Sequence, residues 1–292
     1  MTHKDIYTKF MIEYDKANVT SSYPSLTEYE VATVLDKAYN ALIAQKVTGN
    51  NVRRIALEGD LKNISDLSSL IKQSEYGQPH KVDNLNVVYR DVPEDMLYYI
   101  SGQLFKNAEN PMDEINTRPL PIKLVNHEIA DKFIISAYNM PWIKTPVCYI
   151  EDDKIYVVYD SVNQPELGNN SKMNITYIKT PNRFAKPMDY EEVCEYFDYY
   201  DPKTHYHYGI DDENNSQIKN MSYFDYELIS ITDEMYNREA YEEVRKVLEH
   251  FYTFECNDTV AEELISLAVA FALENVESQR LNSKLNMRGL EA

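Results

Sequence analysis

The sequence predicts an α+β fold: a helical bundle formed by the N- and C-terminal helices, with an inserted small antiparallel β region and an acidic, tyrosine-rich arm. Two helical patterns and one hairpin pattern support this prediction. Apolar residues recur at three- and four-residue spacing in Asp258–Leu285 and again in Leu26–Val47, which is typical of helices with one buried face. Pro146–Ile150 and Lys154–Asp160 read as two strands joined by the turn Glu151-Asp152-Asp153.

The two end helices are expected to pack together and to enclose the rest of the chain as an insertion. Asp258 or Thr259 can cap the last helix, and the small residues in the middle of its apolar face let a second helix approach closely. The capping box Ser25-Leu26-Thr27-Glu28 begins the partner helix, and Thr48-Gly49-Asn50-Asn51 ends it.

The other elements follow from local patterns along the chain. Further helices are expected over Thr2–Lys16, Leu61–Ile71, Pro93–Phe105, Asn126–Ser136 and Asp233–His250. Further strands are expected over Val82–Tyr89, Leu120–Leu124, Asn174–Lys179 and Tyr226–Ile231.

The expected elements fall into three regions. Residues 1–80 and 222–292 form the helical body, and residues 81–187 form a mixed α/β insertion that carries the hairpin. Residues 188–221 form the acidic, tyrosine-rich extension, which is too aromatic for ordinary disorder and too charged for a core.

The composition is acidic and rich in tyrosine. Asp and Glu number 48 against 29 Lys and Arg, a net charge of −19, and eighteen of the acids but only five of the bases lie between Met188 and Cys256. This balance argues against a protein that holds nucleic acid through its phosphates. A soluble, self-repelling surface is the plainer interpretation of the charge. The 25 tyrosines favour interfaces, where a large ring is buried and its hydroxyl stays wet.

The three cysteines, Cys148, Cys194 and Cys256, lie far apart, which favours a reducing compartment without a disulfide framework. The first residues have no apolar signal region, and no apolar run reaches the roughly 20 residues that a membrane span needs. We therefore expect a protein that is made in a cytosol and does not bind a membrane.

No recognised catalytic motif is found in the sequence. His205-Tyr206-His207, with Asp201 and Asp211 nearby, is the one cluster of metal-ligand types, but its polar, loop-like surroundings favour a solvated segment. Asp211-Asp212-Glu213 lacks the glycine and the distal glutamate of a calcium loop. Cys148 has no base at an interpretable spacing and is expected to be a buried strand cysteine. The prediction is a protein that is not an enzyme, with no cofactor and no bound metal.

Three stretches of the sequence, taken together, resemble known proteins. The first is the segment from Ser22 to Lys46, and the second comprises Pro141–Pro146, the Tyr149–Tyr159 hairpin and Tyr177–Pro181. The first resembles the opening, and the second the β portion, of structural proteins in tailed bacteriophages of the crAss-like group. The segment from Glu262 to Arg280 is similar to the last helix of head-to-tail connector (adaptor) subunits. Together these stretches cover about half of the chain.

The resemblance implies an adaptor-like virion protein whose copies form a twelvefold ring at the portal-proximal neck or tail barrel. Its partners would be identical copies, the portal protein and neighbouring tail ring proteins. Double-stranded DNA would pass through the lumen without specific binding, and acids in Met188–Cys256 facing that lumen would repel its phosphates. An acidic outer surface is the alternative interpretation of those acids.

The residues expected to act in such a ring fall into two groups. The expected contacts between subunits are Leu26, Tyr29, Arg53, Arg54, Trp142, Tyr156, Arg280, Met287, Arg288 and Leu290, the last four in or next to the tail Ser283–Ala292. The expected channel-facing acids are Asp198, Asp201, Asp211, Asp212 and Glu213.

Two other functions remain open at this point. One is a cytosolic binding module that presents its tyrosines to a peptide or a glycan, which predicts a stable monomer with a concave aromatic pocket. The other is a metal-dependent hydrolase that uses His205, His207 and Asp211.

Overall fold

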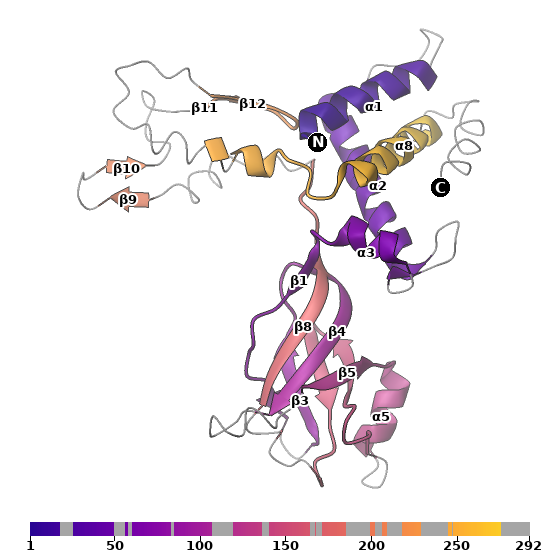
Figure 1. Cartoon of the computed structure of the whole chain (residues 1–292), viewed down its shortest axis with the longest axis vertical. Coiled ribbons are helices and arrows are strands. Elements are labelled where there is room, and N and C mark those ends of the chain that lie inside the picture. The colour runs from indigo at the N-terminus through magenta and orange to yellow at the C-terminus, as the bar shows by residue number, and fades with distance from the viewer. Residues whose placement is uncertain are drawn as a thin grey trace. The chain divides into compact units, whose positions relative to one another are not determined.

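The computed structural model divides the chain into two compact units, residues 1–69 with 181–292 and residues 70–180 (Figure 1). The residues that the structure describes are 1–17, 26–49, 56–57, 60–82, 85–106, 119–135, 140–163, 167, 171–184, 199–201, 206–208, 218–228, 245–246 and 248–275. Each unit is described by itself below.

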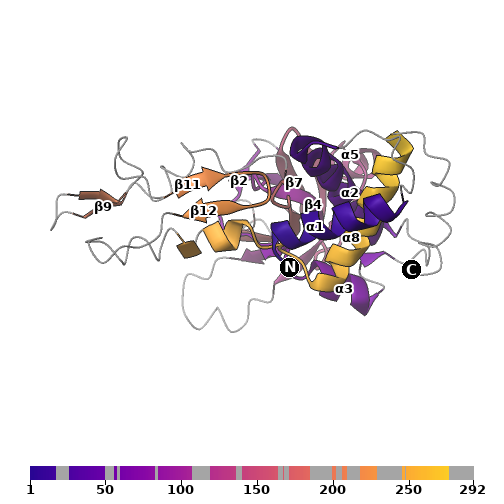
Figure 2. The same ribbon diagram turned by 90° about the horizontal axis from the view of Figure 1, so that it is seen from above.

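The first unit is built on helices from both ends of the chain. They are α1 (His3–Ala17), α2 (Glu28–Thr48), α3 (Leu61–Leu67) and α8 (Asp258–Asn275). Helix α8 packs against α2, as the apolar stripes predict, and also against α1, beside which Figure 2 shows it. Leu35 on α2 and Ala268 on α8 are fully buried.

The helix ends show why these segments begin and stop where they do. The Thr27 side chain accepts from the backbone N–H of Glu30, and the Glu30 carboxylate accepts from the Thr27 N–H, so the capping box uses Thr27 and Glu30. Gly49, in the left-handed region at φ 73°, ends α2 as expected. Asn257, rather than Asp258 or Thr259, caps α8, because its Oδ1 accepts from the Val260 N–H at 2.9 Å.

Four short strands also belong to this unit. β9 (Tyr199–Asp201) pairs with β10 (Tyr206–Tyr208), and β11 (Ile218–Met221) pairs with β12 (Tyr226–Leu228). Most of the predicted extension 188–221 lies outside the described residues, as does the greater part of the helix predicted over Asp233–His250.

The second unit is an eight-stranded curled sheet with helix α5 (His127–Ile135) against strands β6 and β7. Its strands are β1 (Ile71–Gln73), β2 (His80–Lys81), β3 (Val87–Asp91), β4 (Met96–Lys106), β5 (Leu120–Leu124), β6 (Val147–Glu151), β7 (Lys154–Val158) and β8 (Ser171–Lys179). Their order is β1-β8-β4-β5-β6-β7-β3-β2. All neighbours are antiparallel except β5 and β6, which are parallel.

The predicted fold class is therefore wrong. The protein is a mixed α/β structure with a half-barrel of eight strands, and not a helical bundle with a small β insert. The helix predicted over Pro93–Phe105 is strand β4, which pairs with β8 along its length (Figure 1). The spacing of Met96, Ile100 and Leu104 fits a helix, but β8 supplies a pairing partner that local periodicity does not reveal.

The two faces of the sheet have different partners. The inner face holds the main core of this unit, with Val88, Leu104, Val157 and Met173 fully buried. The outer face of β3, β7 and β6 packs its valines against Phe133 of α5 and the neighbouring Ile134. This alternation of inward and outward side chains follows from the two-residue repeat of a strand.

One segment, residues 71–81, supplies both edge strands of the sheet, β1 beside β8 and β2 beside β3. Arg90 on β3 fixes it there: its Nη1 donates to the carbonyl of Glu75 at 2.7 Å and to the carbonyl of Met173 on β8 at 2.8 Å. The guanidinium lies so close to Gly77 that a Cβ there would come within 2.7 Å of it.

The β6–β7 hairpin turns through two residues with positive φ, Asp152 at 46° and Asp153 at 56°. Such a turn matches the right-handed twist of the strands that it joins, and Asn-Gly is its preferred sequence. Aspartate tolerates the left-handed region at a cost, because of its Cβ.

We predict that Asp153→Gly raises the free energy of unfolding by about 1 kcal/mol, because glycine adopts a positive φ without that cost. Asp153→Val should lower it, since a β-branched side chain is strained at this φ. Urea unfolding of the three proteins checks this prediction. Equal stability of the glycine and valine variants would show that the turn does not constrain the hairpin.

His3 is a buried imidazole among aromatic rings in the first unit. Its ring centroid lies 4.4 Å from that of Phe184 and 5.9 Å from that of Tyr252, and its Nδ1 has no hydrogen-bond partner among the described residues. Burial lowers the pKa of His3 to about 4.

This burial predicts a loss of stability in mild acid. The unfolded chain binds a proton at His3 near pH 6.5, whereas the folded protein does not bind it until about pH 4, so stability falls as the pH drops through that window. The loss from this residue approaches about 3 kcal/mol. His3→Phe should remove it, and His250→Gln, at an exposed position, should not. Urea unfolding at pH 7, 5.5 and 4 measures the difference, and parallel pH profiles for all three proteins would contradict the prediction.

Candidate interaction surface on the curled sheet

The register of β3, β7 and β6 arranges their outward side chains in three rows across the sheet. Val87, Val158 and Val147 form a buried row under α5. Tyr89, Tyr156 and Tyr149 form the next row. Asp91, Lys154 and Glu151 form a charged row beside the hairpin turn. Directly opposed side chains of antiparallel strands lie close enough to contact one another.

A histidine extends the tyrosine row at each end, so that five rings follow one another. We call this set the aromatic row; its members in order are His80, Tyr89, Tyr156, Tyr149 and His127. The successive ring centroids are 5.4, 5.7, 5.1 and 5.2 Å apart. His80 lies on edge strand β2 and His127 in the first turn of α5, so the aromatic row includes residues from two elements besides β3, β7 and β6.

The aromatic row is open to solvent along its length. The two histidines are exposed and the three tyrosines are half-buried. Lys154 already holds its Nζ 5.0 Å from the centre of the Tyr89 ring, a cation–π contact. Burial, and then the charges of Glu151, Tyr156 and Asp131, raise the pKa of Tyr149 to about 12, so its hydroxyl stays protonated at neutral pH.

Such a row is suited to bind a partner by stacking and hydrogen bonding. Half-buried tyrosines offer ring faces to cations and apolar groups and keep a hydroxyl for a polar partner. Because the strands are rigid, these rings lose little conformational entropy when a partner covers them. The aromatic row is therefore the candidate functional site of this unit.

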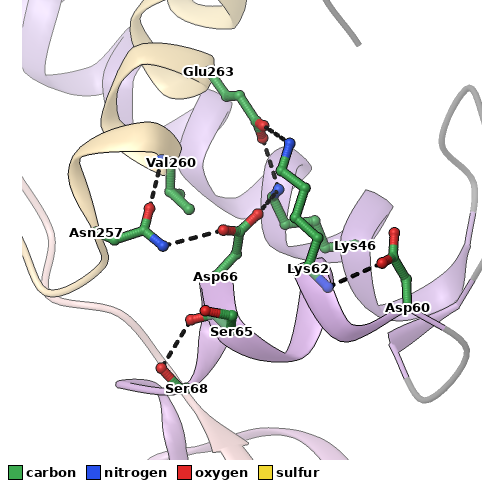
Figure 3. A network of polar contacts seen from close by, with 9 residues as sticks. All are labelled: Lys46, Asp60, Lys62, Ser65, Asp66, Ser68, Asn257, Val260 and Glu263. Carbon is green, nitrogen blue, oxygen red and sulfur yellow. Dashed lines mark hydrogen bonds and ion pairs between the residues drawn. The ribbon is translucent and has the colours of Figure 1, made fainter.

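The first unit holds a cluster of charged side chains where α2, α3 and α8 meet, with Lys46 and Asp66 buried at its centre (Figure 3). Lys46 Nζ lies 2.7 Å from Asp66 Oδ2 and 2.7 Å from Glu263 Oε2. Asn257 donates to the other oxygen of Asp66 at 3.1 Å while it caps α8, and Lys62 pairs with Glu263 at 2.8 Å. Every charge in the cluster has an opposite charge beside it.

This arrangement serves to join the three helices. Burial by itself lowers the pKa of Lys46, but the hydrogen bonds and charges of Asp66 and Glu263 outweigh it and hold that pKa above its ordinary value. The amine is thus kept charged, and it cannot act as the neutral base or nucleophile that a catalytic lysine must become.

The two described cysteines are buried, and their environments make them unreactive. Burial raises the pKa of Cys148 to about 11, although its hydrogen bond to Tyr99 acts in the opposite direction. Burial likewise raises the pKa of Cys256, whose Sγ lies 3.2 Å from the hydroxyl of Tyr39. Both thiols are protonated at neutral pH, and the thiolate is the nucleophilic form. The expectation that Cys148 is a buried strand residue is confirmed.

Two findings concern metals and membranes. Within the part of the chain that the structure describes, no three His, Cys, Asp or Glu side chains gather closely enough to hold a metal ion. None of the described helices combines the length and the apolar character that crossing a bilayer requires.

Four of the expected subunit contacts lie among the described residues. Tyr156 is the central ring of the aromatic row. Trp142 has 66 % of its surface exposed, with Lys144 Nζ 5.8 Å from its ring. Tyr29 in the first unit is 56 % exposed and lies near Tyr223, and Leu26 is half-buried just before α2.

The other predicted site residues lie outside the described structure wholly or in their side chains. Outside the described residues are Arg53, Arg54, Asp198, His205, Asp211, Asp212, Glu213, Arg280, Met287, Arg288 and Leu290. Asp201 and His207 lie on the paired strands β9 and β10, of which only the backbone is described.

Sequence reasoning found the middle of the aromatic row but missed four of its members. Tyr89 and Tyr149 sit at alternate positions within predicted strands, which is the signal that could have placed them on one face with Tyr156. Pairing β3 with β7 requires the register, and that information is not local. His80 and His127 lie on elements outside the hairpin, and no sequence pattern places them beside its tyrosines.

No protein-family model matches this chain, and no curated protein matches it.

We predict that Lys46→Met lowers the free energy of unfolding by about 3–5 kcal/mol, because it leaves Asp66 buried without its cation. Lys62→Met is the matched control: its amine pairs with the same Glu263 but is half-exposed, so the loss should stay below about 1 kcal/mol. Adding Asp66→Asn to Lys46→Met should recover part of the stability. Urea unfolding measures all three variants. Equal losses of stability for Lys46→Met and Lys62→Met would show that the buried ion pair of Lys46 with Asp66 does not join the helices.

Proposed function

We propose that this chain is a structural protein of a tailed bacteriophage virion, a ring-forming subunit of the portal-proximal neck or tail barrel. The observation that carries the proposal is the aromatic row, whose half-buried tyrosines and exposed histidines form a surface on paired strands that is suited to contact another protein chain. The resemblance of three stretches to crAss-like phage structural proteins, in the same order along the chain, supports it.

The distribution of exposed aromatic groups also supports it. A ring needs heterologous contacts, in which one surface of each subunit meets a different surface of the next. Trp142 and the aromatic row belong to one compact unit and the exposed Tyr29 to the other, so each unit offers a surface of its own. Aromatic side chains are enriched at such contacts.

The remaining features of the proposal concern DNA and partners. In this proposal the subunits join the portal to the tail in a twelvefold ring that encloses a channel for double-stranded DNA. The net charge of −19 suits a channel that duplex DNA crosses without binding, because acidic walls repel its phosphates. The protein would be made in the host cytoplasm and incorporated into the virion.

A second candidate is a binding module for a peptide or a glycan, and the same aromatic row favours it. Half-buried tyrosines, each with a ring face and a hydroxyl, suit apolar and polar ligand groups alike. On this alternative the protein acts as a monomer and the aromatic row is occupied by a ligand rather than by a neighbouring copy.

Native mass spectrometry of the full chain, alone and with the portal protein, tests the proposal. We expect a ring of defined copy number when the portal is present, since portal subunits template such assemblies. Electron microscopy of intact particles should then show density for this protein at the neck or tail. Particles without that density, or a chain that stays monomeric beside the portal while it binds a glycan, would contradict the proposal.

A further inference from the structure

The immediate surroundings of the aromatic row are acidic. Asp91 and Glu151 are exposed on the adjacent charged row, and Asp152 and Asp153 are exposed in the turn that follows. Asp131 acts on Tyr149 from α5, at the other end. Lys154 is the cation between them, and it lies over the Tyr89 ring. The rings therefore lie in a negative field.

This combination of rings and carboxylates selects a cationic partner. A guanidinium stacks on the face of a tyrosine and at the same time donates to a carboxylate beside it. Phosphate groups are repelled by the same carboxylates, which disfavours nucleic acid. The Lys154–Tyr89 contact shows that a cation can reach the ring faces in this geometry.

The chain itself contains a segment with the complementary charge. Residues 278–292 carry three bases, Arg280, Lys284 and Arg288, and one acid, Glu291, in a protein whose acids outnumber its bases by 48 to 29. The bases are spaced four residues apart, and leucines at 281, 285 and 290 accompany them. Apolar side chains of this kind can cover the half-buried tyrosines between the cations.

We infer that the aromatic row is the docking site for residues 278–292 of a neighbouring copy, with Arg280 and Arg288 stacking on its tyrosines between the flanking carboxylates. This inference rests on the proposed ring, since it supplies the head-to-tail contact that a ring of identical subunits requires. It assigns the two surfaces of that contact: the outer face of β3, β7 and β6 on one copy and the basic tail on the next.

A labelled peptide of residues 278–292 provides the test. The receptor is the full chain carrying Arg280→Ser and Arg288→Ser, so that its own tail does not compete. We expect saturable binding by fluorescence anisotropy, weakened about tenfold by Tyr156→Leu in the receptor. Tyr76→Leu is the matched control, because this exposed tyrosine of the same unit packs on Phe105 and lies outside the aromatic row.

Charge variants provide a second measurement that does not depend on the core of the sheet. Glu151→Lys, at an exposed position, should weaken binding several-fold, and a peptide with Arg280→Glu and Arg288→Glu should not bind. Absence of binding by the natural peptide, equal binding to the Tyr156→Leu and Tyr76→Leu receptors, or displacement of the peptide by a neutral oligosaccharide would each overturn the inference.

Ring assembly separates this inference from the proposed function. Full chains with Arg280→Ser and Arg288→Ser should lose rings in the presence of the portal by native mass spectrometry. If those rings persist, the docking inference fails and the ring proposal stands. If the natural chain forms no rings but its tail peptide still binds the aromatic row, the docking stands and the ring proposal fails.

Discussion

The register between β3, β7 and β6 is the constraint on which the surface of the second unit depends. A shift of one residue in any of these strands would exchange its inner and outer side chains, moving valines out from under α5 and tyrosines into the half-barrel. The two-residue turn at Asp152 and Asp153 fixes β6 against β7, and the buried valine row fixes β3 in turn. The aromatic row exists because all three strands keep this alignment.

In the helical unit, segments from the two ends of the chain pack together. Apolar packing brings α8 onto α1 and α2, but such packing alone tolerates sliding. Asp66 removes that freedom, because it accepts from Lys46 on α2 and from Asn257 at the start of α8. A buried charge requires its partners at fixed positions, so the polar cluster specifies the arrangement that the apolar stripes only favour.

Local signals predicted the elements, and long-range pairing decided the fold. The hairpin, α2 with its stop at Gly49, and the packing of the end helices follow from turn chemistry and apolar spacing. Strand β4 does not follow from local signals, because Met96, Ile100 and Leu104 have a helical spacing and only the pairing with β8 makes this segment a strand. For the same reason the sequence predicts Tyr156 as a contact residue but not Tyr89 and Tyr149, because only the strand register brings these two beside it.

The edge strands of the eight-stranded sheet affect how readily this protein aggregates. Unpaired strand edges are templates on which other chains add strands and aggregate. Here both edges are occupied by short strands from the single segment 71–81, and one guanidinium, that of Arg90, bonds to that segment and to β8. Release of residues 71–81 would uncover the edges of β8 and β3 together, and the hydrogen bonds of Arg90 to Glu75 and Met173 add to the strand pairing that holds this segment in place.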